Sequence, residues 1–117
     1  MALTTREALK TFEEGSVMYI TMLLHITPFC DCCGFTTPAI VPDVGILAGD
    51  DIVAVETASL DLIKAEDFIE GSLPSPLGRS GDGHLLQQIH GKSPYVQIEE
   101  CIKVGLGNNK YRLSKVM

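Results

Sequence analysis

Basic side chains are scarce in this sequence, and they lie scattered along it. Lysine and arginine together number 9 against 15 aspartates and glutamates, which gives a formal net charge of −6. A surface that binds nucleic acid neutralises phosphates with clustered lysine and arginine side chains. We therefore expect no nucleic-acid partner.

Long apolar runs and a secretion signal are also lacking. The apolar run at residues 17–26 is far shorter than the roughly 20 residues that cross a bilayer, and Thr21 and His25 interrupt it. The N-terminal region has no basic stretch followed by an apolar core and a small-residue cleavage site, which is the pattern of a secretory signal. The sequence accordingly predicts a cytoplasmic protein without a membrane anchor.

Familiar catalytic motifs are missing as well. We find no Ser-His-Asp pattern, nucleophile elbow or zincin motif. The segment GRSGDG at residues 78–83 does not fit the G-x-G-x-x-G fingerprint and follows no predicted strand, so it does not indicate a phosphate cradle. The sequence names no reaction, and whether the protein is an enzyme stays open.

The length and the loop signals predict one domain with one mobile connection. A chain of 117 residues can bury a core and matches the usual size of a single domain. Residues 68–84 are rich in glycine, proline and serine, which is typical of a flexible loop. We expect a single domain over residues 1–117, with this flexible segment inside it.

Two apolar segments predict strands, and both are expected to be buried. Residues 16–26 are almost continuously apolar without alternation, which favours a strand covered on both faces. Residues 39–48 predict a second strand, although Pro42 cannot donate to a ladder and implies a break there. A last short strand is expected at residues 111–116.

Four helices are predicted around these strands. The first covers residues 5–14, where Thr4 and Glu7 have the spacing of a capping box. The second covers residues 52–65, where Asp50 or Asp51 could cap the free amides. The other two are expected at residues 85–90 and from Ser93-Pro94 to about residue 104.

These elements together predict an α/β fold with a small mixed sheet, buried apolar strands and flanking helices. A sheet of so few apolar strands leaves edges and faces that need cover. We therefore expect a homodimer, or a larger protein as partner.

Three of the four cysteines are crowded into one polar turn, which holds Cys30, Asp31, Cys32 and Cys33. In a chain that looks intracellular, reduced thiols or metal ligands are more typical than disulfides. Thiolates and imidazole suit zinc or iron, so Cys30, Cys32 and the nearby His25 are candidate metal ligands. A buried or reactive thiol cluster is the alternative, and His25 could instead be a hydrogen-bonded structural residue.

Glu56 and Cys101 each lie on the apolar side of a predicted helix. Glu56 falls on the otherwise apolar side of the helix at residues 52–65, where a carboxylate needs a cation, a metal or a hydrogen-bond network. Alternatively it lies at the edge of that side and reaches solvent. Cys101 lies on the apolar side of its helix and is interpreted as a small hydrophobic residue.

Four motifs in order resemble a known family. They are Ile-Thr-Pro-x-Cys-Asp-Cys, Ile-Val-Pro-Asp-x-Gly-Ile, Asp-x-Val-Ala-x-Glu-x-Ala-x-x-Asp and Gly-Leu-Gly-x-x-x-Tyr, at residues 26–32, 40–46, 51–61 and 105–111. They resemble the C-terminal part of the uncharacterised iron-sulfur-centre proteins, whose function is unassigned. Members of that family are longer and carry a ferredoxin-like insert with the recognisable cluster ligands, which this chain lacks.

The resemblance implies one shared site. Its residues would be Cys30, Asp31, Cys32, Asp43 and Glu56, although Glu56 stands where the family usually has aspartate. The family's cluster ligands are not carried over, because the insert is missing. Taken with the thiolate chemistry of the turn, the expected cofactor is zinc, iron or an iron-sulfur cluster, and the expected function is a metal- or iron-sulfur-associated redox module. The alternative is a non-catalytic subunit or remnant domain that completes a larger protein or a homo-oligomer.

Overall fold

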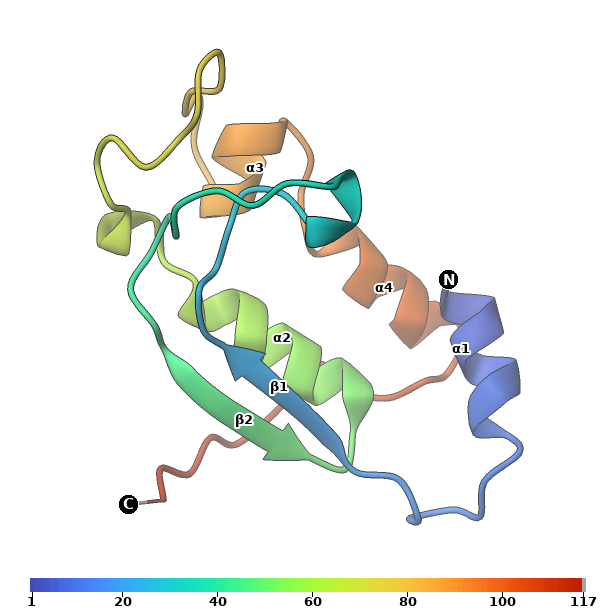
Figure 1. The fold of residues 1–117 in the computed structure, drawn as a ribbon. Helices are drawn as coiled ribbons and strands as arrows, with labels where there is room; N and C mark the ends of the chain where they lie inside the picture. Colours follow the sequence, from blue (N-terminus) through green and yellow to red (C-terminus); the bar gives the residue numbers. More distant parts are fainter. Residues whose placement is uncertain (117) are drawn as a thin grey trace. The chain divides into compact units, whose positions relative to one another are not determined.

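The computed structural model describes residues 1–116 as an α/β protein (Figure 1). In chain order its elements are α1 (Ala2–Leu9), β1 (Tyr19–Leu23), the 3₁₀ turn η1 (Asp31–Cys33), β2 (Gly45–Gly49), α2 (Ile52–Leu62), the 3₁₀ turn η2 (Ala65–Asp67), α3 (Leu85–His90) and α4 (Val96–Lys103). The two strands pair in an antiparallel sheet. The predicted fold class, a small sheet with flanking helices, is confirmed. In this part of the chain, no helix combines the length and the apolar character needed to cross a membrane.

The chain divides into two compact units, and each contains segments that are distant in sequence. Unit 1 comprises Met1–Thr21, Ile46–Asp61 and the described residues from Tyr95 onward. Unit 2 comprises Met22–Gly45 and Leu62–Pro94. Both strands therefore begin in one unit and end in the other.

The core of unit 1 forms around α2. The buried apolar side chains of this unit are Leu47, Val53, Val55, Ala58 and Ile98. α1 and α4 pack against each other (Figure 1). Asp51 caps α2 because its Oδ1 accepts hydrogen bonds from the amides of Val53 and Ala54, at 2.8 and 3.0 Å. Of the two aspartates that could cap this helix, Asp51 is thus the one that does.

Two aspartates tie the C-terminal segment to α2 within unit 1. Asp51 Oδ2 accepts a hydrogen bond from the amide of Asn108 at 2.9 Å. At the other end of the helix, the hydroxyls of Tyr95 and Tyr111 donate to the two carboxylate oxygens of Asp61, at 2.6 and 2.7 Å. The helix therefore fixes the segment at both of its ends.

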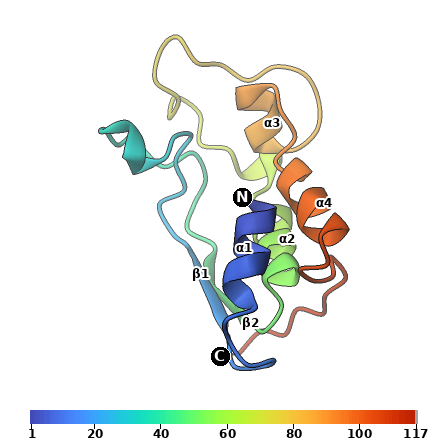
Figure 2. The same ribbon diagram turned by 90° about the vertical axis from the view of Figure 1, so that its right-hand side faces the viewer.

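Unit 2 has a core of its own and contains most of the loops. Its buried apolar side chains are Leu23, Ile40, Val41, Ile63 and Leu85. Residues 68–84 form no helix or strand, as the composition predicts (Figure 2). Within them the Arg79 guanidinium lies 4.5 Å from the centre of the Phe68 ring and donates to Gln88 in α3. The loop is thus attached at its start and to the helix that follows.

The first helix differs from its prediction because it is not begun by a capping box. It starts at Ala2, with no side-chain cap, and the amide of Thr5 donates to the carbonyl of Met1. Glu7 instead accepts hydrogen bonds from Arg6 and Lys10 at 2.9 Å, so its carboxylate is not used to cap the helix. Helix α1 consequently ends at Leu9, well before the predicted residue 14.

Both strands are shorter and more exposed than predicted. In β1, Ile20 and Met22 are 65% and 67% exposed, and in β2 Ile46 is 64% exposed. The described sheet has only two strands, so alternate side chains of each remain uncovered, and burial on both faces was the wrong expectation for residues 16–26. β2 begins at Gly45, after the break predicted at Pro42.

The predicted strand at residues 111–116 is not formed, and this segment has no regular structure. It is held by the Tyr111 side chain rather than by a ladder of backbone hydrogen bonds. α3 has the predicted bounds. α4 starts at Val96 instead of Ser93, with Tyr95 as its N-cap, and ends one residue before the predicted end.

Candidate functional site

The chain leaves β1 through a sharp turn that Asp43 stabilises. His25 adopts a positive φ of 48°, a conformation that is uncommon for a residue other than glycine. Its backbone amide donates to Asp43 Oδ1 at 2.7 Å, and the amide of Val44 donates to the carbonyl of Leu23 at 2.9 Å. The Asp43 carboxylate therefore stabilises this turn through a hydrogen bond to its backbone.

Aromatic contacts hold the loop that follows. The Phe29 ring makes edge-type contacts with Phe35 and His90, with ring centres 5.8 and 5.6 Å apart. His90, in the last turn of α3, also places its Nε2 2.7 Å from the carbonyl oxygen of Pro28. Phe29 and Phe35 stand on either side of the cysteines in sequence, so these contacts close the base of the loop.

The cysteines lie in the tight turn at the end of this loop (Figure 2). We call Cys30, Asp31, Cys32 and Cys33 the thiol turn. The amide of Cys33 donates to the carbonyl of Cys30 at 3.0 Å. Gly34 ends the turn with a φ of 83°, a conformation that glycine adopts without strain. All three cysteines are exposed and reduced.

Cys30 and Cys32 interact directly through their sulfur atoms. Cys30 Sγ accepts a hydrogen bond from the amide of Cys32 at 3.3 Å, and a second one from the Cys32 thiol. The thiol bond first, and the amide bond next, lower the pKa of Cys30. Donating the thiol hydrogen raises the pKa of Cys32 to about 11, mainly because the proton is shared with Cys30. Cys30 is thus the cysteine of this pair that ionises more readily, whereas Cys32 keeps its proton to higher pH.

The structure brings together some of the predicted site residues. His25, Cys30, Asp31, Cys32 and Asp43 all belong to unit 2. His25 and Asp31 are exposed, and only the backbone amide of His25 is seen to bind Asp43. The shared role of these residues in one metal site stays a prediction.

Glu56 belongs to unit 1, where it lies in α2 and is half-buried. The pKa of Cys101 in α4 is raised, first by burial of the thiol and next by the negative charge of Glu56. A half-buried carboxylate that reaches solvent was one of the two interpretations of this residue. Its membership in a site with the cysteines stays a prediction.

A metal site with three or more ligands is not formed by the side chains as they stand. Over residues 1–116, no group of three or more histidine, cysteine, aspartate or glutamate side chains is arranged to hold a metal ion. The chemistry of the thiol turn nevertheless fits soft metals, because thiolates are their preferred ligands. The turn thus offers a pair of sulfur ligands rather than a complete set.

Sequence reasoning missed the residues that hold the loop. No sequence pattern singled out His90, yet its ring binds a carbonyl 62 residues away. Phe29 and Phe35 flank the cysteines, and this aromatic bracket is a signal that could have been noticed. The contact with His90 has no such local signal.

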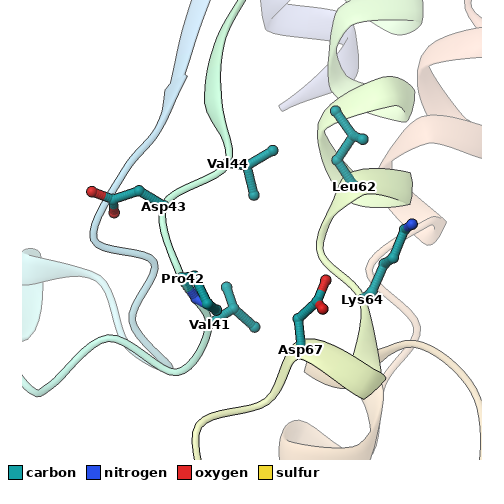
Figure 3. Close-up of a pocket in the computed structure, with 7 residues that line it drawn as sticks. All are labelled: Val41, Pro42, Asp43, Val44, Leu62, Lys64 and Asp67. Carbon is teal, nitrogen blue, oxygen red and sulfur yellow. The ribbon is translucent and has the colours of Figure 1, made fainter.

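Unit 2 also contains a hollow of about 290 Å³ that the sequence did not indicate (Figure 3). Its lining residues are Val41, Pro42, Asp43, Val44, Leu62, Lys64 and Asp67. Val44 and Leu62 extend toward each other across it, and the Asp67 carboxylate extends into it, whereas the Asp43 carboxylate points away (Figure 3). The cysteines do not line it, so the hollow and the thiol turn are separate features.

Comparison with known proteins assigns no family to the chain. No protein-family model, curated protein or solved structure matches it. The resemblance to the iron-sulfur-centre proteins therefore stays a prediction that depends on the four motifs.

Proposed function

We propose that this protein is a metal- or iron-sulfur-associated redox module whose centre is the thiol turn. The observation that supports this most is the close approach of Cys30 and Cys32, in which Cys30 Sγ accepts a hydrogen bond from the Cys32 amide at 3.3 Å. Thiolates are the form in which cysteine binds metals, and the hydrogen bonds received by Cys30 favour its thiolate. The two sulfurs can therefore act on one ion.

The proposed ligands are Cys30 and Cys32, with His25 as a third and Asp31 beside them. Asp43 supports the site indirectly because it fixes the backbone of His25. Glu56 is the remaining residue that the resemblance implies. Bound iron or an iron-sulfur cluster would supply one-electron chemistry, whereas zinc has no redox chemistry of its own.

A reducing compartment suits this proposal. Exposed free cysteines persist where thiols are kept reduced, and the thiol turn carries three of them. We accordingly propose that the protein works in the cytoplasm. The family proposed by resemblance, the iron-sulfur-centre proteins, is in keeping with such a site.

Metal analysis of protein purified without air tests the proposal. Wild-type protein should retain iron or zinc, and bound iron should give visible absorbance. Cys30→Ser and Cys32→Ser should lose most of the metal. Cys101→Ser is the matched control, because Cys101 lies in the other unit, and it should keep the wild-type content. The proposal would be refuted if wild-type protein were purified without metal and bound neither iron nor zinc when these were added.

A second candidate function is that of a non-catalytic subunit or domain that completes a larger protein or a homo-oligomer. It is favoured by the uncovered side chains of the strands, since Ile20, Met22 and Ile46 are each about two-thirds exposed. A two-stranded sheet is marginally stable unless something packs on it, and unpaired strand edges can accept further strands.

Light scattering over a range of concentrations tests the homo-oligomer. Wild-type protein should exceed the monomer mass, and Ile20→Thr should shift it toward the monomer while keeping a residue suited to strands. Leu113→Thr removes an exposed apolar side chain outside the strands, so this control should behave like wild type. A wild-type protein that stays monomeric at high concentration would rule the homo-oligomer out.

A further inference from the structure

We propose that Cys30 and Cys32 form a reversible disulfide and that the protein exchanges it with small disulfides, such as oxidised glutathione. The inference concerns the same turn as the proposed redox function but requires no metal. It depends on the hydrogen bond from the Cys32 amide to Cys30 Sγ, which holds the two residues together, and on the exposure of both residues.

The spacing of the two cysteines suits a disulfide. Bridged cysteines have Cα atoms about 4.4 to 6.8 Å apart. Residues two apart are separated by at most about 7 Å when fully extended, and the bend of η1 brings Cys30 and Cys32 closer than that. Cys30 lies just before the 3₁₀ turn with an extended backbone, and its sulfur folds back over the amide of Cys32. The Cys30 sulfur thus lies next to the backbone of Cys32.

The neighbouring pair is less suitable. Cys32 and Cys33 are consecutive, and Cα atoms of consecutive residues lie about 3.8 Å apart, which is below the range of ordinary disulfides. Cys33 also lies inside the 3₁₀ turn, where its amide is bound to the carbonyl of Cys30. The Cys30 sulfur lies at the amide of Cys32, so Cys32 is the partner that the geometry favours.

The exchange proceeds in two balanced steps. The Cys30 thiolate attacks one sulfur of oxidised glutathione, forms a mixed disulfide and expels the first glutathione as a thiolate. Cys32 then loses its proton to solvent and attacks Cys30 Sγ, which forms the internal disulfide and expels the second glutathione. Two thiols of the protein are oxidised, and one glutathione disulfide is reduced to two thiols.

The aromatic bracket keeps the turn accessible during this reaction. Phe29 and Phe35 contact each other at the base of the loop, and His90 binds the Pro28 carbonyl. None of these contacts uses a cysteine side chain, so the sulfurs can change partners while the base of the loop stays in place.

Peptide mapping after exposure to oxidised glutathione tests the proposal. The full-length protein is first freed of metal with a chelator, oxidised, alkylated and digested. The expected product is a disulfide between Cys30 and Cys32, with release of two glutathione thiols and with Cys33 and Cys101 alkylated. A disulfide that involves Cys33, or a product that stops at mixed disulfides, would overturn the proposal.

Matched variants identify the roles of the two cysteines. Cys32→Ser should lose the internal disulfide and accumulate the mixed disulfide on Cys30, while Cys101→Ser should form the internal disulfide as the wild type does. Cys32→Ser that still forms an internal disulfide would count against the assignment. Since mapping of the wild type is decisive alone, poor folding of a variant does not prevent the test.

The test separates this inference from the proposed function. Protein that retains no metal but forms the internal disulfide would remove the metal proposal alone. Protein that binds metal through the thiol turn but forms no internal disulfide after chelation would remove this inference alone.

Discussion

Cys30 and Cys32 are both exposed, yet they differ in their tendency to ionise. The difference comes from the direction of the hydrogen bonds between them, because Cys30 accepts from both the thiol and the amide of Cys32. Accepted hydrogen bonds favour a thiolate, and a donated one favours the thiol. A turn of four residues thereby makes two chemically different cysteines.

Alkylation at different pH values should reveal this difference. In metal-free protein, Cys30 should react with iodoacetamide at a lower pH than an ordinary exposed cysteine does, because its pKa is lowered. Cys32 should react only as the pH approaches about 11. Mass spectrometry of peptides would follow each site, in a Cys101→Ser background. Equal reactivity of both sites at every pH would contradict the hydrogen-bond direction.

The sequence predicted part of this site and missed its support. The crowding of three cysteines is visible in the sequence, because the three are near neighbours in the chain. The contact of His90 with Pro28 depends on how α3 packs in unit 2. Asp43 was expected near a metal, yet its carboxylate binds the His25 amide, a partner that only the path of the backbone could reveal.

Among the elements, α2 is one whose start is defined by its own sequence. Asp51 supplies the cap, and the predicted start at Ile52 is confirmed. Capping acts over two or three residues, so a local pattern suffices to predict it. Strand burial, in contrast, depends on how many strands pair. Residues 16–26 were expected to be covered on both faces, but β1 has only β2 as a partner in the described chain.

The two aspartates before α2 provide a matched test of the cap. Asp51→Ala should lower the free energy of unfolding by about 1 to 2 kcal/mol, because it removes the hydrogen bonds from the amides of Val53 and Ala54 and the one from Asn108. Asp50→Ala changes an exposed neighbour and should leave stability nearly unchanged. Urea denaturation monitored by circular dichroism would measure both. An equal effect of the two variants would show that Asp51 has no special part in capping.

For the molecule as a whole, the tyrosines connect stability to alkaline pH. Burial first, and the hydrogen bond to Asp61 next, raise the pKa of Tyr95. The hydrogen bond to Asp61 is the main cause of the raised pKa of Tyr111. A phenol with a raised pKa in the folded state stabilises the fold fully below its unfolded pKa of about 10, and this stabilisation is lost as the pH rises.

We therefore expect unfolding to become easier above about pH 10. Tyr111→Phe should reduce this loss, because it removes one of the phenols that must stay neutral in the fold. The measurement is the urea midpoint of both proteins across the alkaline range. Their difference at neutral pH serves as the control, since it reports the lost hydrogen bond alone. A variant with an unchanged alkaline slope would mean that Tyr111 does not contribute to it.

The two contacts of the Asp51 carboxylate also affect where the chain can be truncated. One oxygen starts a helix, and the other receives the amide of Asn108, beside which Gly107 passes so closely that any larger residue would collide with the carboxylate. Truncating the chain before residue 105 would remove the hydrogen bond from Asn108 to Asp51 and the one from Tyr111 to Asp61. Fragments for domain mapping should accordingly keep these last residues. Although the segment has no helix or strand, its hydrogen bonds attach it to both ends of α2.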